Sequence, residues 1–184
     1  MSVAVNNFSS ILNQMRDNYK GDTLKDFSLA EFIGLQSISL SDASAEIIEA
    51  TKNHEQNLNN FHLQQEADLL TNVQSLENDK DQSSFMRKMN ENRAKAKENA
   101  NAMIDKYYDK IEDIGNKNPN QQTVILLVAQ KVGEFMNEIM NKIMEVFTSV
   151  IATVTKAISK AIDYIASSFK SIANTAKNFF SSLF

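Results

Sequence analysis

The sequence contains no cysteine and no tryptophan, and only one proline and four glycines stand among its 184 residues. The absence of cysteine excludes a disulfide framework, a thiolate zinc site, an iron–sulfur cluster and a cysteine nucleophile. So few glycines and prolines leave little material for tight turns, which argues against a β-sandwich, a barrel or a βαβ fold. The chain is therefore expected to be all-α, and it is long enough for one folded unit.

Charge is unevenly placed along the chain. The formal net charge is -4, which argues against a nucleic-acid binder, because such a protein needs a basic face to replace counterions on phosphate. Residues 146–184 carry +3 and residues 1–145 carry -7. The start of the chain has neither a basic cluster nor a long apolar run, so no secretory signal peptide is expected there. We predict a secreted or membrane-associated protein exported by a dedicated machine, with a cytoplasmic location as the alternative.

Residues 1–40 are expected to form short N-terminal helices. Apolar residues recur there at steps of three and four, which predicts an amphipathic helix that Gly21 ends. Ser28 and Glu31 have the spacing of a capping box, so a second short helix is expected to follow and to end by Ser39. The apolar stripe of the first helix consists of Val5, Phe8, Leu12, Met15 and Tyr19.

Residues 41–114 are expected to form a long helical arm, because apolar residues recur near the helical period through most of this range. The polar stretch 77–84 leaves room for a break. If the arm were collinear, it would extend about 110 Å at 1.5 Å per residue. Beyond it, Gly115 suits the C′ position of a helix and Pro119 the first position of the next one, so a hairpin turn is predicted between them.

Residues 119–184 carry the clearest pattern. One apolar residue per turn from Ile125 to Leu183 gives 16 steps over 58 residues, a mean of 3.6. This period is typical of a straight α-helix without the supercoil of a strict 3.5 repeat. A single very long amphipathic helix of about 100 Å is therefore expected, packed on the preceding arm as an elongated helical hairpin or coiled-coil bundle.

A second apolar row widens the stripe of this helix beyond the seam of a two-stranded coiled coil. Acidic and lysine side chains interrupt every 18-residue window, so a transmembrane span is not expected. The opposite face is rich in serine, threonine and lysine, as in helices that lie in a lipid interface. The predicted membrane or assembly face comprises Ile143, Phe147, Ile151, Val154, Ile158, Ile162, Ile165 and Phe169, and the predicted contacts to anionic lipid are Lys156, Lys160, Lys170 and Lys177.

The alternative interpretation is that the wide stripe is a core face or is covered by partner subunits. His54 and His62 lack the spacing of a metal site, so we expect them to face solvent or a partner, with a modest pH response as the alternative. The basic residues between Arg87 and Lys97 are expected to form a solvated face. No phosphate-binding loop or nucleophile motif is present, so we predict no enzymatic activity, cofactor, metal or small-molecule substrate.

The layout resembles the filament and translocator proteins of bacterial type III secretion, with Leu40 to Leu76 and Val124 to Phe184 as the two long helices. Those proteins often contain a glycine-rich membrane-spanning hairpin, which this sequence lacks. The segment from Thr155 to Ile162 also resembles the amphipathic style of phasins, which coat lipid-like granules. Helical-hairpin pore-forming toxins are a third resemblance.

The sequence therefore predicts a non-enzymatic, self-associating helical protein that engages a membrane or apolar surface through its C-terminal amphipathic helix. The resemblance implies an exported translocator, filament or pore-forming component, and the partners expected are further copies of the chain, a membrane surface or partner helices. The alternative is a purely structural coiled-coil subunit of a filament, capsid or granule coat that assembles without lipid.

Overall fold

A computed structural model of the chain describes residues 5–20, 29 and 39–184, which form helices and contain no β-strand. The all-α prediction is thus confirmed for this part of the chain. The α-helices are α1 (Phe8–Lys20), α3 (Ala45–Asp79), α4 (Gln82–Lys117), α5 (Gln122–Val154) and α6 (Ile158–Ser181). Two 3₁₀ turns, η1 (Leu40–Asp42) and η2 (Pro119–Gln121), precede α3 and α5.

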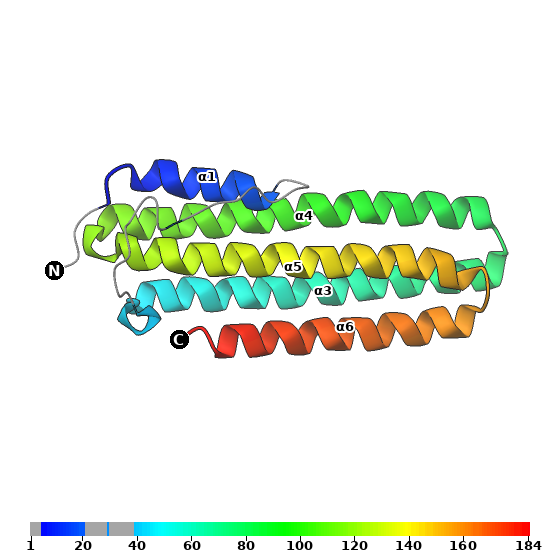
Figure 1. Ribbon diagram of the computed structural model, residues 1–184. Helices are drawn as coiled ribbons and strands as arrows, with labels where there is room; N and C mark the ends of the chain where they lie inside the picture. The colour runs from blue at the N-terminus through cyan, green and yellow to red at the C-terminus, as the bar shows by residue number, and fades with distance from the viewer. Residues whose placement is uncertain (1–4, 21–28, 30–38) are drawn as a thin grey trace.

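The four long helices form an antiparallel bundle in which each helix runs opposite to the one before it (Figure 1). α3 packs on α4 and α6, and α5 packs on the same two helices from the diagonal position. α1 lies along α4 and α5 at the end of the bundle where the α4–α5 connection lies. The core runs the length of the bundle, since buried apolar side chains come from all five α-helices.

The α3–α4 connection is short and locally encoded. Lys80 adopts a left-handed conformation with φ 55°, and its N–H donates to the Leu76 carbonyl at 3.0 Å. Asp81 then caps α4, because its carboxylate accepts a hydrogen bond from the Ser84 N–H at 3.0 Å. The possible break within 77–84 is present, between Asp79 and Gln82. The chain reverses here and α3 packs against α4, so residues 41–114 do not form the single collinear arm that the sequence left open.

The predicted hairpin turn joins α4 to α5. Asn118 caps the end of α4, and its side chain also donates to the Glu46 carboxylate at 3.1 Å, which ties the turn to the start of α3. Pro119 occupies the first position of η2, as the sequence predicts. Gly115 does not serve as the C′ residue, because α4 continues to Lys117. It lies inside the helix, where a Cβ would overlap the ring of Phe8.

The single long helix predicted over 119–184 is wrong. The chain leaves the helical conformation at residues 155–157 and α6 folds back along α5 (Figure 1). The physical reason lies in the width of the apolar stripe, which one straight helix would leave largely in water. In the folded-back arrangement each of the two helices covers part of the stripe of the other, and α3 and α4 cover the rest.

α1 confirms the first of the predicted N-terminal helices, and the second falls outside the described residues. Arg16 of α1 forms an ion pair with Asp109 of α4 at 2.8 Å, and Lys20 forms one with Asp105 at 2.8 Å. Gly133 of α5 allows the ring of Tyr19 to approach the helix backbone. These contacts fix α1 along the groove between α4 and α5.

We predict that Gly133→Ala loosens α1, because the added Cβ would overlap the Tyr19 ring and come within 2.8 Å of the Tyr108 hydroxyl. The expected loss in free energy of unfolding is about 1–3 kcal/mol, in spite of the better helix propensity of alanine. Hydrogen exchange should show faster exchange in residues 8–20. The control is Lys131→Ala on the exposed side of α5. Unchanged protection of α1 in Gly133→Ala would contradict the close approach of Tyr19.

Candidate membrane and assembly site

The predicted membrane or assembly face lies inside the bundle. Ile143, Phe147 and Val154 of α5 and Ile165 and Phe169 of α6 are buried, none with more than 6% of its surface exposed. The other three members, Ile151, Ile158 and Ile162, are partly buried and pack against the same core. The structure therefore brings all eight residues together, but as a core shared by α5, α6 and their neighbours.

The aromatic residues near the end of the chain anchor α6 to the other helices. The ring of Phe179 stacks on Phe135 of α5 with 3.9 Å between centroids and an interplanar angle of 3°. Phe180 meets the same ring edge-on at 5.7 Å and is buried. The C-terminal part of α6 is thus held by aromatic contacts worth about 0.5–1.5 kcal/mol each beyond their buried area.

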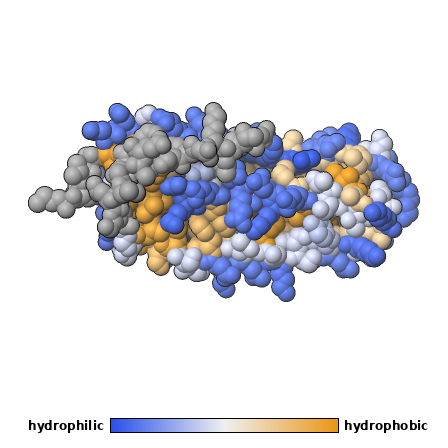
Figure 2. All heavy atoms as spheres, in the orientation of Figure 1, coloured by the Kyte–Doolittle hydropathy of each residue, from blue (hydrophilic) through white to orange (hydrophobic). Residues whose placement is uncertain are grey.

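The lysines predicted to contact anionic lipid are exposed. Lys156 lies in the α5–α6 connection, and Lys160, Lys170 and Lys177 lie on α6. Figure 2 shows one face of the molecule, where hydrophilic side chains outline the bundle and hydrophobic ones appear in a strip between them. The large apolar side chains exposed in the described part of the chain are Leu63, Met86, Tyr164 and Phe184.

A row of polar residues that no sequence motif marked lies along the buried face of α3. We call it the α3 polar seam, and it consists of Thr51, His54, His62, Gln65 and Asn72. Two of its members bond to α4. The Thr51 hydroxyl lies 3.2 Å from the Tyr107 hydroxyl, and the Asn72 amide donates to the sulfur of Met89 at 3.8 Å.

His54 is the most enclosed member of the seam. It is 3% exposed, with its ring 4.6 Å from the Tyr107 ring and 6.4 Å from the Phe180 ring of α6. Its Nε2 atom has no hydrogen-bond partner. Burial among these uncharged groups lowers the pKa of His54 to about 4, so the ring is neutral at pH 7. The expectation of a solvated histidine is wrong at this position.

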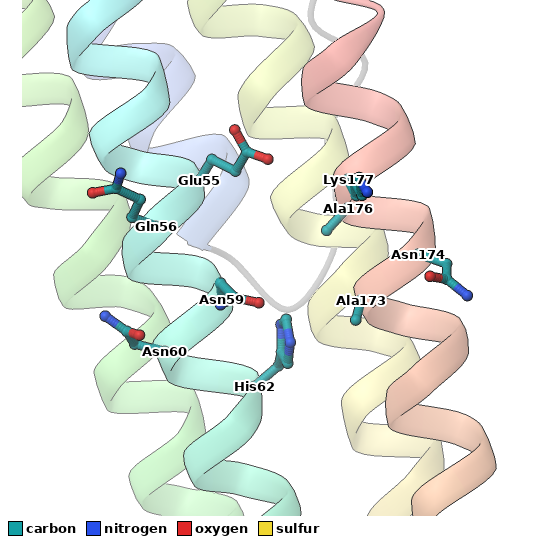
Figure 3. A pocket seen from close by; sticks show the side chains of 9 residues that line it. All are labelled: Glu55, Gln56, Asn59, Asn60, His62, Ala173, Asn174, Ala176 and Lys177. Atoms are coloured by element: carbon teal, nitrogen blue, oxygen red, sulfur yellow. The ribbon is translucent and has the colours of Figure 1, made fainter.

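His62 is also buried, and it lines a groove between α3 and α6 with a volume of about 650 Å³ (Figure 3). Burial lowers the pKa of His62, and a hydrogen bond to the Leu58 carbonyl partly offsets this shift. Glu55 and Asn59 project from α3 toward the same gap, where the small side chains of Ala173 and Ala176 face them from α6. The α3–α6 interface is therefore hollow and polar at this level. Of the two environments predicted for His62, solvent is wrong because the side chain is buried, and contact with a partner stays a prediction.

The groove offers no recognisable catalytic arrangement. Its polar lining consists mainly of amides, with the imidazole of His62, the carboxylate of Glu55 and the ammonium group of Lys177. Across residues 5–20, 29 and 39–184, no three potential metal ligands are grouped closely enough to hold an ion. In the same ranges, no helix combines the length and the apolarity needed to cross a bilayer.

The basic run on α4 lies where the charge pattern predicts. Arg87 pairs with Glu91 at 2.8 Å, one turn away, and both side chains are more than half exposed. Exposed pairs of this kind contribute little to stability because water and salt screen them. The pairing is typical of a solvated helix face.

Comparison with known proteins adds no relative: the sequence matches no protein-family model, and no curated protein and no solved structure matches the chain. The resemblance to type III secretion proteins therefore rests on layout alone and stays a prediction.

We predict that His54 makes the bundle sensitive to acid. The unfolded chain binds a proton at His54 near pH 6.5, whereas the folded chain does so only near pH 4. The unfolded state thus holds more protons in this window, and stability that is complete above pH 6.5 falls as the pH drops to about 4. The difference of pKa corresponds to about 3 kcal/mol.

The test compares the free energy of unfolding of the wild type and of His54→Phe by urea denaturation at several pH values. The phenyl ring keeps the aromatic volume and removes the titrating group. The wild type should lose about 3 kcal/mol more than the variant between pH 6.5 and 4. Parallel curves for the two proteins would show that His54 does not titrate in this way.

Proposed function

We propose that the chain is a non-enzymatic, self-associating helical protein that engages a membrane surface through the segment formed by α5 and α6. One observation carries the proposal: the wide apolar stripe of this segment is covered because α6 folds back, while the other face of α6 carries exposed lysines. A segment with an apolar face and a basic face suits an anionic lipid interface once it leaves the bundle.

The energy balance of such a release supports the proposal. Burial of each large apolar side chain is worth about 1.5–3 kcal/mol relative to water, so α6 does not leave the bundle for water. The acyl boundary of a bilayer gives the same side chains an equally apolar environment. The lipid surface then favours the open form by its differential affinity for that form.

The α3 polar seam lowers the cost of release on the protein side. His54 Nε2 and Gln65 Oε1 lack hydrogen-bond partners in the closed bundle. A buried polar atom without a partner costs about 1–3 kcal/mol. When α6 moves away, water reaches His54 Nε2, because Phe180 of α6 lies beside its ring in the closed bundle, and can supply this bond.

We predict that fixing α6 to α3 blocks membrane binding. Gln56→Cys and Asn174→Cys place thiols on exposed positions of α3 and α6 that line the same groove. Because the chain has no other cysteine, a bismaleimide joins this pair alone. The uncrosslinked protein should float with vesicles of equal parts phosphatidylglycerol and phosphatidylcholine, and the crosslinked protein should not.

The matched control crosslinks α3 to α4 and leaves α6 free. Asn53→Cys and Lys110→Cys line a second hollow, between α3 and α4, and both positions are exposed. This crosslink should leave flotation unchanged. Equal flotation of the protein with α6 crosslinked would contradict the proposal, and large particles without vesicle binding would favour the alternative of a structural subunit that assembles without lipid.

We also predict that the lysines of the segment set the dependence on anionic lipid. Changing Lys156, Lys160, Lys170 and Lys177 to glutamine should weaken binding to the same vesicles by roughly 1 kcal/mol per lysine near the surface. Because the side chains are exposed, the thermal midpoint should change little. The control removes the same charge from α3 and α4 by changing Lys52, Lys95, Lys106 and Lys110. If both sets weaken binding equally, the contact does not lie on α6.

A further inference from the structure

The α5–α6 turn differs from the other two turns of the bundle. Thr155 is still helical, with φ -66° and ψ -20°, and Ala157 is extended, with φ -165° and ψ 117°. The N–H groups of Lys156 and Ala157 both donate to the Thr153 carbonyl, at 2.9 and 3.0 Å. Three residues thus separate two helices of opposite direction.

No local signal in the sequence encodes this turn. The α3–α4 turn has the left-handed Lys80 and the capping Asp81, and the α4–α5 turn has Asn118 and Pro119. Residues 146–184 contain neither glycine nor proline, and no side chain caps the start of α6. Alanine, at position 157, is the best helix former. The turn therefore depends on the packing of α6 on α3 and α5, because the local sequence supplies neither a breaking residue nor a cap.

The apolar period also continues across the turn without a change of phase. Val150, Val154, Ile158, Ala161 and Ile165 follow at steps of four, four, three and four, the spacing of one helix face. All five are buried or partly buried in the folded-back form. In a straight helix they would form one continuous stripe. The same residues thus satisfy a bent and a straight arrangement.

We propose that residues 155–157 are a hinge, that α5 and α6 straighten into one helix, and that α6 then packs into the bundle of a second copy in exchange for the α6 of that copy. The straight helix, from Gln122 to Ser181, would be about 90 Å long at 1.5 Å per residue. Reciprocal exchange of one element is a known route to a symmetric dimer. This inference deepens the proposed function, since it names the partner of the segment and rests on the release of α6.

A second copy fits because it offers the surface that α6 has left. α3 and α5 of the second copy reproduce every contact of the closed form, including the Phe135–Phe179 stack and the approach of Phe180 to His54. The direction also matches. α6 starts at the end of the bundle that holds the α5–α6 turn and runs to the opposite end (Figure 1). A straightened helix therefore enters the second copy at the end that holds the α5–α6 turn of that copy, and it runs in the direction that α6 has there.

Spin labels distinguish the two arrangements within one chain. Asn141→Cys and Ser171→Cys place labels at exposed sites of α5 and α6, 30 residues apart. In the folded-back form these helices pack with their axes about 8–10 Å apart. In a straight helix the labelled sites are about 45 Å apart. Labelled protein is refolded with excess unlabelled protein, so that distances within a chain dominate, and dimer and monomer are then separated by size.

Proline and alanine at position 158 form the matched pair of variants. Ile158 opens α6, where proline is tolerated, and the extended Ala157 suits the residue before a proline. Inside a straight helix, proline removes the bond from residue 158 to residue 154. Ile158→Pro should therefore lower the equilibrium constant for dimer formation by roughly 100-fold for each chain, because proline is costly in a helix interior. Ile158→Ala also removes the isoleucine side chain but keeps the backbone N–H, so this variant should still exchange α6.

The expected result is a short distance in the monomer, a distance of about 45 Å in the dimer, and loss of that dimer in Ile158→Pro only. A dimer with only the short distance, a long-distance dimer in Ile158→Pro, or no dimer at any concentration overturns the exchange. Vesicle flotation separates this result from the proposed function. Exchange without flotation refutes the membrane contact alone, and flotation without exchange refutes the second copy alone.

Discussion

The width of the apolar stripe on α5 and α6 is the constraint on which the bundle depends. Two rows of large side chains cannot be covered by a single neighbouring helix, so at least two further helices are needed. In the structure α6 covers part of α5, and α3 and α4 complete the core. The antiparallel order of the four helices follows from the short connections between them.

Helix content and the α4–α5 turn were predicted from local signals, and the stretch 77–84 was identified only as a possible break. Asp81 and Pro119 act through their own backbone neighbours, whereas the Asn118 side chain also bonds to Glu46 of α3. The third turn, at residues 155–157, was not predictable, because those residues contain no glycine or proline and no side chain caps the helix that follows. The bend is selected only by the free energy gained when α6 packs on α3 and α5, and this free energy depends on the tertiary structure.

The candidate site was predictable in part for the same reason. The periodicity identified the apolar face of α5 and α6, since spacing alone determines which residues share a helix face. It did not show whether that face meets lipid, a subunit or the same chain. The α3 polar seam was missed, although its signal was present: His54 and Gln65 stand in register with Leu58, Phe61 and Leu69. Both polar residues occupy positions where the helical period places apolar side chains, and both are buried.

The buried side chain of Gln122 joins helices that stay in place in the proposed exchange of α6. Its oxygen accepts a hydrogen bond from the Val5 N–H at 2.8 Å, and its nitrogen donates to the Gly115 carbonyl at 3.2 Å. One amide thus joins the chain before α1 to both arms of the α4–α5 hairpin, far along the bundle from residue 157 (Figure 1). Cargo fused before residue 5 would stay on the stationary part, whereas cargo fused after α6 would travel with the helix that moves.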